Sequence, residues 1–593
     1  MARLYSAYDR FNSLSSSKKN LYSQTFIKPY LPLWRSKLVV VSLLTAFLIL
    51  IVRAFWIQIV NQNFYIIQGQ KRYQNTINFN IKRERIVDRN GALLAVSLST
   101  YEIWANPKLL SKEDYPLLAR LLKMPINELK RHLKKKQNFV ILKRQIDKDT
   151  VSRIEQCRFK GIAKINNLKR AYPEGESMAH VIGFTNMENN GQEGIELIAN
   201  TILSGKPKQQ YKVIHDQLGR IVSYVCPESS EQSGQLIKLT IDNRLQQVAY
   251  NQIKTAVLAN QAKSGSVVIL DARNGEILAL ANYPSFDPKD RSKLMGQHLR
   301  NHAVIDVFEP GSTIKPLIIA LSIDSGKVHP KTIIDTGRLG TYKVGGSVIH
   351  DTSNYGKLTV SQALQKSSNI ALAKLALDLP PQMIWNKYRE YGIGCRPKIM
   401  FPGVASGKLR SYKKWRPIEQ ATMSYGYGLS MSLLQIAQMY TAYSSDGMLH
   451  SASLLKEDHL STEKISSHRV TTPDTAAAIR SMLELAVSEG GTGKAARVDN
   501  YRVGGKTGTA WKQEGTSYAK GKYRSMFVGI APISNPHLIV AVMINEPRGH
   551  YYGGIVAGPV FSSIMSKGLQ LLSIPPDVPY THKKGADNTF ISR

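Results

Sequence analysis

The sequence predicts one membrane-spanning helix near the N-terminus, an α+β domain after it, and a larger domain that combines an antiparallel sheet with helices. Three observations support this fold class. An uncharged apolar run covers residues 38–52, a strand–turn–strand pattern covers 264–284, and two β-rich runs cover 523–532 and 537–547. Long helical patterns separate the first strands from the last ones. We therefore expect one sheet in which the first and last parts of the larger domain pair.

Composition excludes several classes of protein. The chain has 593 residues, of which 43% are hydrophobic and 21% charged. These shares are close to ordinary globular usage and exclude a wholly disordered chain or a multi-span membrane protein. The three cysteines, Cys157, Cys226 and Cys395, lie far apart without a CxxC pair. We expect neither a disulfide scaffold nor a metal site, and nothing in the sequence implies a cofactor.

The chain is strongly basic, with 79 Lys and Arg against 43 Asp and Glu and a formal net charge of +36 at pH 7. Such a charge attracts nucleic acid, anionic lipid and anionic cell-wall polymers. The sequence contains no zinc-finger spacing, RNP element or basic zipper, and its basic residues are scattered. We therefore expect no nucleic-acid partner.

The apolar run LVVVSLLTAFLILIV (38–52) is short for a membrane span. As a helix it covers about 22 Å of a hydrocarbon core that is roughly 30 Å thick. Extension to Val60 gives a transmembrane helix over 38–60. Arg53 then extends toward an interface, and Trp56 suits the aromatic belt there.

The flanks of this helix predict its orientation. Residues 1–37 carry many Lys and Arg and a single acid, Asp9, which favours a cytoplasmic basic tail. A cleaved signal peptide is the alternative, but no small-x-small cleavage site follows before Asn61. We expect an uncleaved, single-pass anchor in the inner (cytoplasmic) membrane, with everything beyond residue 60 on the periplasmic side.

Residues beyond the anchor divide into two domains and a tail. Residues 61–80 are polar, and 81–97 predict a strand, a turn at Asn90-Gly91 and a second strand. Helical spacing of leucines follows over 109–136, and the polar stretch 226–235 predicts a linker. We expect domains over 61–232 and 233–573, and a flexible tail over 574–593 with three prolines.

Ser312 and Lys315 form the first element that carries chemistry, in EPGSTIKP (309–316). Their spacing places a hydroxyl and an amine on one face of a helix. Serine becomes a nucleophile when a base takes its proton, and lysine is such a base when desolvation or a nearby cation lowers its pKa. Other S-x-x-K pairs occur in this chain, but only Ser312 precedes an apolar run, LIIALSI, that can bury the amine.

Two further elements strengthen this signal. Ser367-Ser368-Asn369 lies in KSSNIALAK (366–374), and Lys506-Thr507-Gly508-Thr509 lies in GGKTGTAWK (504–512). Each element alone is weak. The order S-x-x-K, S-x-N, K-T-G is the signature of penicillin-recognising serine acyl enzymes.

These motifs resemble those of the class B penicillin-binding proteins, and more narrowly of their division-specific, FtsI-type transpeptidases. The similarity extends from the anchor to about residue 570, through RERIVDRNG (83–91), RAYPEGESMAHVIGFT (170–185), GQEGIE (191–196), VFEPGSTIKP (307–316), SYGYGLSMSLLQIAQ (424–438) and YYGGIVAGPVF (551–561). Glu84 stands where the family usually has glycine. An EDxxFxxHxG glycosyltransferase motif is absent, which argues against the bifunctional class A.

The resemblance implies a fold and a reaction. The fold would be an α+β pedestal of the dimerisation type, then a β-lactamase-like transpeptidase domain whose antiparallel sheet is flanked by helices, with an all-helical lobe. The reaction would cross-link peptidoglycan stem peptides ending in D-Ala-D-Ala at the division septum. β-Lactams would block the enzyme, and the polymerase FtsW and other division proteins would be its partners.

The resemblance also implies a role for each motif residue. Ser312 would be the nucleophile, Lys315 the general base, Ser367 the proton relay, Asn369 the orienting group and Lys506 an electrostatic group. Thr507, Gly508 and Thr509 would bind substrate, and the N–H groups of Ser312 and Thr509 would form the oxyanion hole. Arg83, Asp88, Arg170 and Glu196 are expected in a buried ion-pair network, and Asp351 as a possible support of the site.

Three other functions remain open at this point. One is an elongation-type transpeptidase. Another is a β-lactamase or D,D-carboxypeptidase, in which water releases the acyl group from Ser312, although such a hydrolase needs no anchored pedestal. The third is a non-enzymatic β-lactam sensor or septal scaffold, although the basic tail of 37 residues before the anchor is short for a signalling module.

Overall fold

The computed structural model describes residues 33–78, 82–134, 140–205, 210–215, 221–225, 234–290, 296–456, 466–515 and 517–578. The chain forms two compact units, one of residues up to Asn78 with Gln209–Glu228, and one of Phe79–Lys208 with Ser229–Arg593. Most of the expected linker at 226–235 and most of the expected tail lie outside the described residues.

The first unit contains the apolar helix. α1 runs from Leu33 to Phe55, continues as a π-helical turn over Trp56–Val60, and has no buried residue. The helix therefore begins five residues before the predicted start at residue 38, and its length suits a membrane span. Residues 61–80 were expected only as a polar segment, and they contain helix α2 (Gln62–Tyr73) and strand β1 (Gln74–Asn78). β1 pairs with β6 (Gln210–His215), and β6 pairs with β7 (Ile221–Val225).

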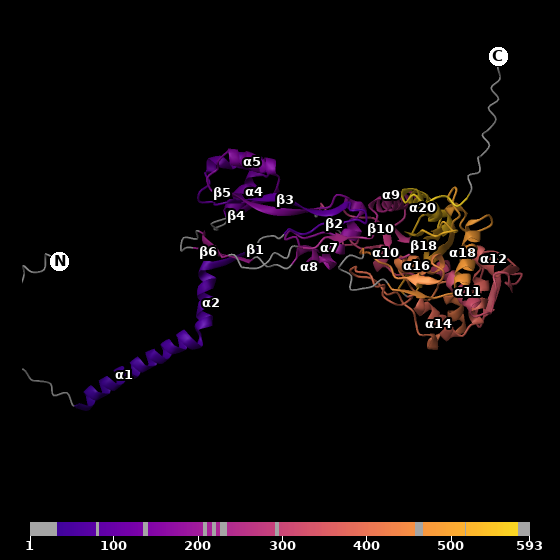
Figure 1. Cartoon of the computed structure of the whole chain (residues 1–593), viewed down its shortest axis with the longest axis horizontal. Coiled ribbons are helices and arrows are strands. Elements are labelled where there is room, and N and C mark those ends of the chain that lie inside the picture. The colour runs from indigo at the N-terminus through magenta and orange to yellow at the C-terminus, as the bar shows by residue number, and fades with distance from the viewer. Residues whose placement is uncertain are drawn as a thin grey trace, which may run out of the picture. The chain divides into compact units, whose positions relative to one another are not determined.

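The second unit begins with residues 82–205, called the pedestal region below (Figure 1). The predicted hairpin at Asn90-Gly91 is confirmed, because it joins β2 (Ile86–Val87) to β3 (Leu93–Ala105). β3 is the central strand and also pairs with β4 (Val140–Ile146) and β5 (Ile162–Ala171), while β2 pairs with β8 (Ile237–Lys238). The region also contains short helices: α3 (Tyr115–Leu121), α4 (Ile126–Leu133), α5 (Lys148–Gln156), α6 (Ala179–Ile182), α7 (Gly194–Ile198), α8 (Asn200–Ser204), and the 3-10 turns Lys112–Asp114 and Gly175–Ser177.

The described part of the leucine-rich stretch, residues 109–134, contains two α-helices, α3 and α4, with a break between them. Lys123 has a φ of 48°, in the left-handed region that ends a helix, and Pro125 precedes the first turn of α4. Helical spacing is present on both sides of the break, so the sequence pattern indicated the helices but not the break.

A buried ion-pair network stabilises the pedestal region, as predicted. The Glu196 carboxylate accepts hydrogen bonds from Nε of Arg83 and, at 2.6 Å, from Nε of Arg170. All three side chains are almost fully buried. Asp88 instead accepts from the backbone N–H groups of Asn90 and Ala92 in the hairpin turn, and from Asn243 N at the start of helix α9 (Asn243–Ala259).

The larger part of the second unit has a five-stranded antiparallel sheet. Its order is β10-β9-β19-β18-β17, formed by Ile277–Tyr283, Ser264–Asp271, Leu538–Asn545, Ser517–Ala531 and Gly504–Glu514. β9 pairs with β19, so the first and last parts of this region do pair, as the sequence predicted. The Arg273-Asn274-Gly275 turn joins β9 and β10 as expected, and β17 lies at the edge.

Helices cover both faces of this sheet, which explains why its strands read as continuous apolar runs. α9 (Asn243–Ala259) and α20 (Gly558–Leu571) pack together against one face (Figure 1). The helical lobe packs against the other face. Alternate residues of β9 and β19 point into each of the two cores.

The lobe contains the expected helices, and short strand pairs lie among them. Its helices are α11 (Lys315–Asp324), α12 (Val360–Gln365), α13 (Asn369–Leu377), α14 (Pro381–Glu390), α15 (Pro417–Met423), α16 (Leu433–Met439), α17 (Thr441–Ser444) and α18 (Pro473–Val487). The strand pairs are β11 (Ile333–Asp335) with β14 (Lys357–Thr359), β12 (Thr341–Val344) with β13 (Ser347–His350), and β15 (Met448–His450) with β16 (Ser467–Arg469). α10 (His302–Ile305) and α19 (Gly553–Val556) complete the α-helices of the described residues, with 3-10 turns at Gly311–Ile314, Tyr412–Lys414 and Lys494–Ala496.

Candidate active site

Ser312 lies in a 3-10 turn (Gly311–Ile314) that leads directly into α11, whose first residue is Lys315. A 3-10 helix has three residues per turn, so residues i and i+3 lie on one side of it. The sequence predicted Ser312 and Lys315 on one helical face. The structure places both residues at this junction, on a turn that is tighter than an α-helix.

The Lys315 side chain is fully buried, at 0% exposure. Its ammonium group donates to the Ser367 carbonyl oxygen at 2.6 Å, to Ser367 Oγ at 3.1 Å and to Asn369 Oδ1 at 2.8 Å. The first two motifs, about 50 residues apart in the sequence, therefore meet at one amine.

Burial lowers the pKa of Lys315 well below its ordinary value, and the positive charge of Lys506 lowers it further. The carboxylate of Asp351 acts in the opposite direction. A lysine in such surroundings holds its neutral form at a lower pH than a solvated lysine. It can therefore accept a proton from a neighbouring hydroxyl.

A strained loop between α12 and α13 presents Ser367 and Asn369. Ser367 has a φ of 61°, in the left-handed region that a serine rarely adopts. Asp351 holds this loop, because its carboxylate accepts from Ser368 Oγ and from the backbone N–H groups of Asn369 and Ile370. An acid at the N-terminus of α13 also suits the helix dipole. Asp351 therefore supports the site through the loop.

The K-T-G element lies on β17, at the edge of the sheet. Lys506 is fully buried and donates to the Thr507 carbonyl oxygen at 3.1 Å. Burial lowers the pKa of Lys506 to about 7. The Thr509 hydroxyl accepts from Gly553 N at 3.0 Å, and the Thr507 hydroxyl pairs with the Thr492 hydroxyl at 2.9 Å.

The nucleophile turn packs directly against β17. A Cβ atom added at Gly508 would lie 2.8 Å from Thr313 Cγ2, so glycine at this position allows the close approach of turn and strand. The expectation that Gly508 binds substrate remains a prediction. Gly426 supports the turn from the other side, since its carbonyl oxygen accepts from Gly311 N and a Cβ there would lie 2.1 Å from Gly311 O. Gly426 belongs to the SYGYGLSMSLLQIAQ motif (424–438), and its contact with Gly311 brings this motif to the nucleophile turn.

The Ser312 side chain is half-buried, and its hydroxyl makes no hydrogen bond with the residues that the structure describes, whereas its carbonyl oxygen accepts from Lys315 N. Its backbone N–H group, which the sequence analysis assigned to the oxyanion hole, makes no hydrogen bond with these residues either. The structure thus brings together the 3-10 turn of Ser312, the buried Lys315, the loop of Ser367 and Asn369, and the strand that carries Lys506 to Thr509.

The motif search missed residues that surround the site. Thr492 reaches Thr507, and Glu309 accepts from Gly428 N at 2.8 Å and from the Tyr518 hydroxyl at 3.0 Å. Tyr523 stacks on Tyr551 with ring centroids 4.1 Å apart. These contacts join segments that are distant in the sequence, and distant contacts leave no local sequence signal. Only the EPGS and YYGG motifs indicated some of the residues that surround the site.

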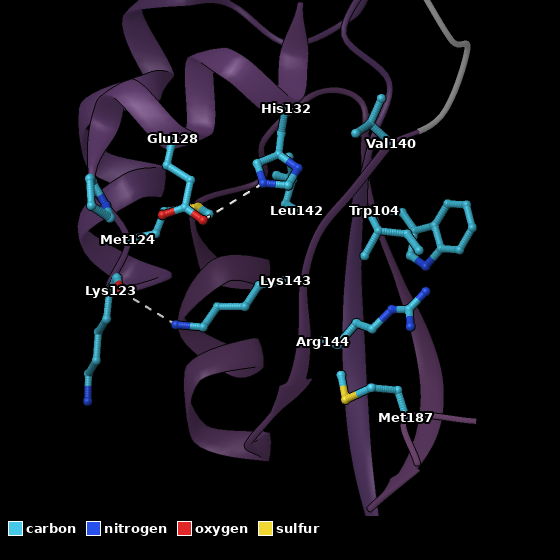
Figure 2. Close-up of a pocket in the computed structure, with 12 residues that line it drawn as sticks. Trp104, Lys123, Met124, Glu128, His132, Val140, Leu142, Lys143, Arg144 and Met187 are labelled. Atoms are coloured by element: carbon cyan, nitrogen blue, oxygen red, sulfur yellow. Dashed lines mark hydrogen bonds and ion pairs between the residues drawn. The ribbon is translucent and has the colours of Figure 1, made fainter. Parts of the chain in front are cut away.

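A separate cavity of about 700 Å³ lies in the pedestal region between α4 and β4 (Figure 2). Its lining groups bond to one another: Lys143 donates to the backbone of Leu122 and Lys123, and His132 lies 3.9 Å from Glu128. Figure 2 shows the Lys143–Lys123 and His132–Glu128 contacts as dashed lines, with Arg144 on the strand side. Its lining contains no serine, threonine or cysteine that could act as a nucleophile, so the site chemistry lies elsewhere.

Comparisons with known proteins agree with this geometry. Residues 265–566 match the penicillin-binding protein transpeptidase domain, and residues 80–239 match the penicillin-binding protein dimerisation domain. The probable peptidoglycan D,D-transpeptidase PenA of Neisseria gonorrhoeae is 41% identical over 562 residues, 93% of this chain and 95% of PenA. The peptidoglycan D,D-transpeptidase FtsI of Escherichia coli K12 is 34% identical over 568 residues, 94% of this chain and 95% of FtsI.

A solved structure shows the same similarity for the larger region. The transpeptidase domain of Burkholderia pseudomallei penicillin-binding protein 3 is 45% identical, with a TM-score of 0.52, and the match covers 57% of this chain and 98% of that one. Since both domain families match and the relatives cover nearly the whole chain, it belongs to the class B penicillin-binding proteins, a family of peptidoglycan D,D-transpeptidases.

Proposed function

We propose that this chain is a serine-type D,D-transpeptidase that cross-links peptidoglycan stem peptides ending in D-Ala-D-Ala, with Ser312 as nucleophile. The observation that carries the proposal is the buried amine of Lys315, bonded to Ser367 and Asn369 and three residues from Ser312. A buried lysine without a carboxylate partner is costly to fold, and general-base chemistry explains its presence.

Acylation would proceed by proton transfer to Lys315, attack of Ser312 on the substrate and loss of the terminal D-Ala. Lys315 takes the proton of the Ser312 hydroxyl, and Oγ forms a bond to the carbonyl carbon of the penultimate D-Ala. The bond from that carbon to the terminal D-Ala nitrogen then breaks. Ser367, 3.1 Å from the Lys315 amine, passes the proton back to the leaving amine, while Asn369 orients Lys315 and the substrate amide.

Binding of the donor peptide would use the edge strand β17. An edge strand has N–H and C=O groups that no neighbouring strand uses, and an extended peptide can pair with them. The charge of Lys506 and the hydroxyls of Thr507 and Thr509 would receive the terminal carboxylate. The N–H groups of Ser312 and Thr509 would stabilise the oxyanion.

The second half-reaction decides between the enzyme classes. In a transpeptidase the amine of a neighbouring stem peptide attacks the Ser312 ester, and the serine regains its proton. In a D,D-carboxypeptidase or β-lactamase, water attacks this ester in place of the amine. The pedestal region and the apolar helix α1 favour the transpeptidase, because a hydrolase of small substrates needs neither.

A partition assay tests this proposal. The full chain in detergent receives a D-Ala-D-Ala peptide and an amine acceptor, and mass spectrometry compares cross-linked with hydrolysed product. We expect cross-linked dimer to form with wild type and to disappear with Ser312→Ala. Hydrolysed product alone would support the carboxypeptidase, and acylation by benzylpenicillin without any peptide turnover would support the sensor.

We also propose that the enzyme acts at the division septum as a single-pass inner-membrane protein with residues 1–37 in the cytoplasm. Similarity to FtsI over most of the chain and the length of α1 support this. In this arrangement residues 61–232 would form the pedestal and 233–573 the transpeptidase domain, and α1 with the pedestal would contact FtsW. Depletion in the source cells tests the role: filaments with blocked septa support division, and rounded cells support the elongation type.

A further inference from the structure

A second cavity, of about 580 Å³, lies beside the nucleophile turn and apart from the acylating groups. Three stretches of chain form its walls: the residues just before the turn, the bridged segments around 408 and 430, and the hairpin of β17 and β18. It is lined by Val307, Phe308, Glu309, Lys408, Arg410, Gly428, Leu429, Ser430, Trp511, Gln513, Gly515, Tyr518 and Arg524. Glu309 is three residues from Ser312, and Trp511 is two residues from Thr509, so a ligand extending from the site can reach this cavity.

Arg524 is the key residue of this cavity. It lies opposite Ala510 in the β17–β18 register, and its guanidinium lies over the Phe308 ring, 5.3 Å from the ring centroid. Among the residues that the structure describes, it makes no hydrogen bond and no ion pair within 4 Å. Partial burial lowers the pKa of Arg524, so the cation has lost part of its hydration without gaining a hydrogen-bond acceptor.

The carboxylates near Arg524 already have other partners. Asp306 pairs with Arg300 at 2.6 Å and with His302 at 2.7 Å. Glu546 pairs with Lys512. Glu309 accepts from Gly428 N and from the Tyr518 hydroxyl. These acids stabilise the charge of Arg524 through space, but none of them occupies its five N–H donors.

Two further cations line the cavity. Lys408 is exposed, and its side chain makes no hydrogen bond within the described part of the chain, whereas Arg410 is paired with Glu419 at 2.9 Å. The formal charge of the lining is positive, since Lys408, Arg410 and Arg524 outnumber Glu309. Phe308, Leu429 and Trp511 supply apolar walls beside these charges. A charged group carried on a partly apolar chain, such as a peptide, suits this lining better than a small hydrated anion does.

We propose that this cavity is a carboxylate subsite for the stem peptide, in which Arg524 forms a bidentate pair with a carboxylate other than the C-terminal one. The inference rests on the proposed function. A guanidinium presents parallel N–H donors that match a carboxylate, and Lys408 adds a point charge at the rim. The carboxylate can belong to the donor peptide or to the acceptor peptide, and both present the same chemistry to Arg524.

Two matched peptides test the subsite with the full chain in detergent. One D-Ala-D-Ala peptide carries a free side-chain carboxylate on its third residue, and the other carries the amide. Each serves first as donor and then, without the D-Ala-D-Ala end, as acceptor. We expect wild type to use the free acid more efficiently than the amide in one of these two roles. That role identifies which peptide, donor or acceptor, supplies the carboxylate that binds Arg524. Arg524→Gln should lower kcat/KM for the free acid by about 10-fold to 100-fold, the range of a charge-assisted hydrogen bond. It should lower kcat/KM less for the amide peptide, whose neutral carbonyl accepts a weaker hydrogen bond, so that the acid-to-amide ratio falls.

The controls distinguish failure of the proposed subsite from failure of the proposed transpeptidase function. Lys567→Gln removes one exposed charge on α20 and should leave the acid-to-amide ratio at its wild-type value. If Arg524→Gln shows no thermal unfolding transition, and therefore does not fold, the acid-to-amide ratio is measured with Lys408→Gln instead. We expect this ratio to fall less in Lys408→Gln than in a folded Arg524 variant. Equal use of both peptides by wild type, or an unchanged ratio in the folded variants, overturns the subsite. Absence of any acylation of wild type by benzylpenicillin overturns the proposed function itself.

Discussion

The ammonium group of Lys315 donates a 2.8 Å hydrogen bond to Oδ1 of Asn369. This bond joins the first residue of α11 to the first residue of α13, inside a core where Lys315 has no exposed surface. Two nearby charges of opposite sign act on this amine, Lys506 and Asp351. The protonation of Lys315 therefore depends on the K-T-G strand and on the anchor of the S-S-N loop.

Substitutions of these two residues should shift the pH profile in opposite directions. Lys506→Gln removes a positive charge, so the pKa of Lys315 rises and the base limb of acylation moves to higher pH. Asp351→Asn removes a negative charge, so the limb moves to lower pH, each by roughly 1 pH unit. The measurement is the second-order rate constant of benzylpenicillin acylation from pH 5 to 10. Asp378→Asn, an exposed acid at the end of α13, is the control, and parallel shifts in both variants would argue against Lys315 as base.

Lys506 should lower the stability of the folded protein at neutral pH. Its folded-state pKa is about 7, far below its ordinary value, so the unfolded chain binds the proton more tightly. Stability of wild type then rises with pH from about 7 toward 10.5, the range in which only the unfolded state stays protonated. We expect Lys506→Met to melt several degrees above wild type at pH 7, with the difference shrinking at higher pH. A variant that melts below wild type at pH 7 would contradict this assignment.

Gly426→Ala should displace the nucleophile turn. A Cβ at Gly426 would lie 2.1 Å from the Gly311 carbonyl oxygen, and the backbone φ there is +90°. Gly392→Ala is a matched control, because Gly392 has a φ of +82° and nothing within 4 Å of its added Cβ. Both variants carry the same backbone strain, but only the first also has the clash. We expect benzylpenicillin acylation to fall by at least about 100-fold in Gly426→Ala alone, and equal losses in both would rule out the steric explanation.

Glu196→Gln should destabilise the pedestal region. The change leaves Arg83 and Arg170 buried without a carboxylate, and removal of one partner from a buried ion pair typically costs about 3–5 kcal/mol. Denaturant unfolding of the full chain in detergent measures the loss. Glu188→Gln, at an exposed position in the same region, should change the unfolding free energy by less than about 0.5 kcal/mol. Equal stability of the two variants would show that the network contributes little.

Short-range patterns predicted much of this fold. Asn90-Gly91 and Asn274-Gly275 form hairpin turns, and the glycine of each pair has a positive φ, 90° at Gly91 and 78° at Gly275, which few other residues tolerate. The pairing of β9 with β19 followed from apolar strands at both ends of one region. Three motifs in a known order also predicted which segments meet at Lys315.

Tertiary contacts determine what the sequence did not reveal. The φ of +61° at Ser367 depends on Asp351 and on the burial of Lys315, neither of which leaves a local signal at Ser367. Likewise, Arg524 appears in the sequence as one basic residue of a strand. Only the folded structure shows that Asp306, Glu309 and Glu546 lie near it, each already paired, and that no described residue accepts a hydrogen bond from it.

Intact-mass spectrometry of the full chain in detergent after addition of benzylpenicillin, wild type beside Ser312→Ala, tests the central claim most directly. The account predicts a long-lived adduct of one drug mass on wild type and none on Ser312→Ala. Rapid loss of the wild-type adduct would indicate a hydrolase. An adduct on Ser312→Ala, or none on either protein, would contradict Ser312 as the nucleophile.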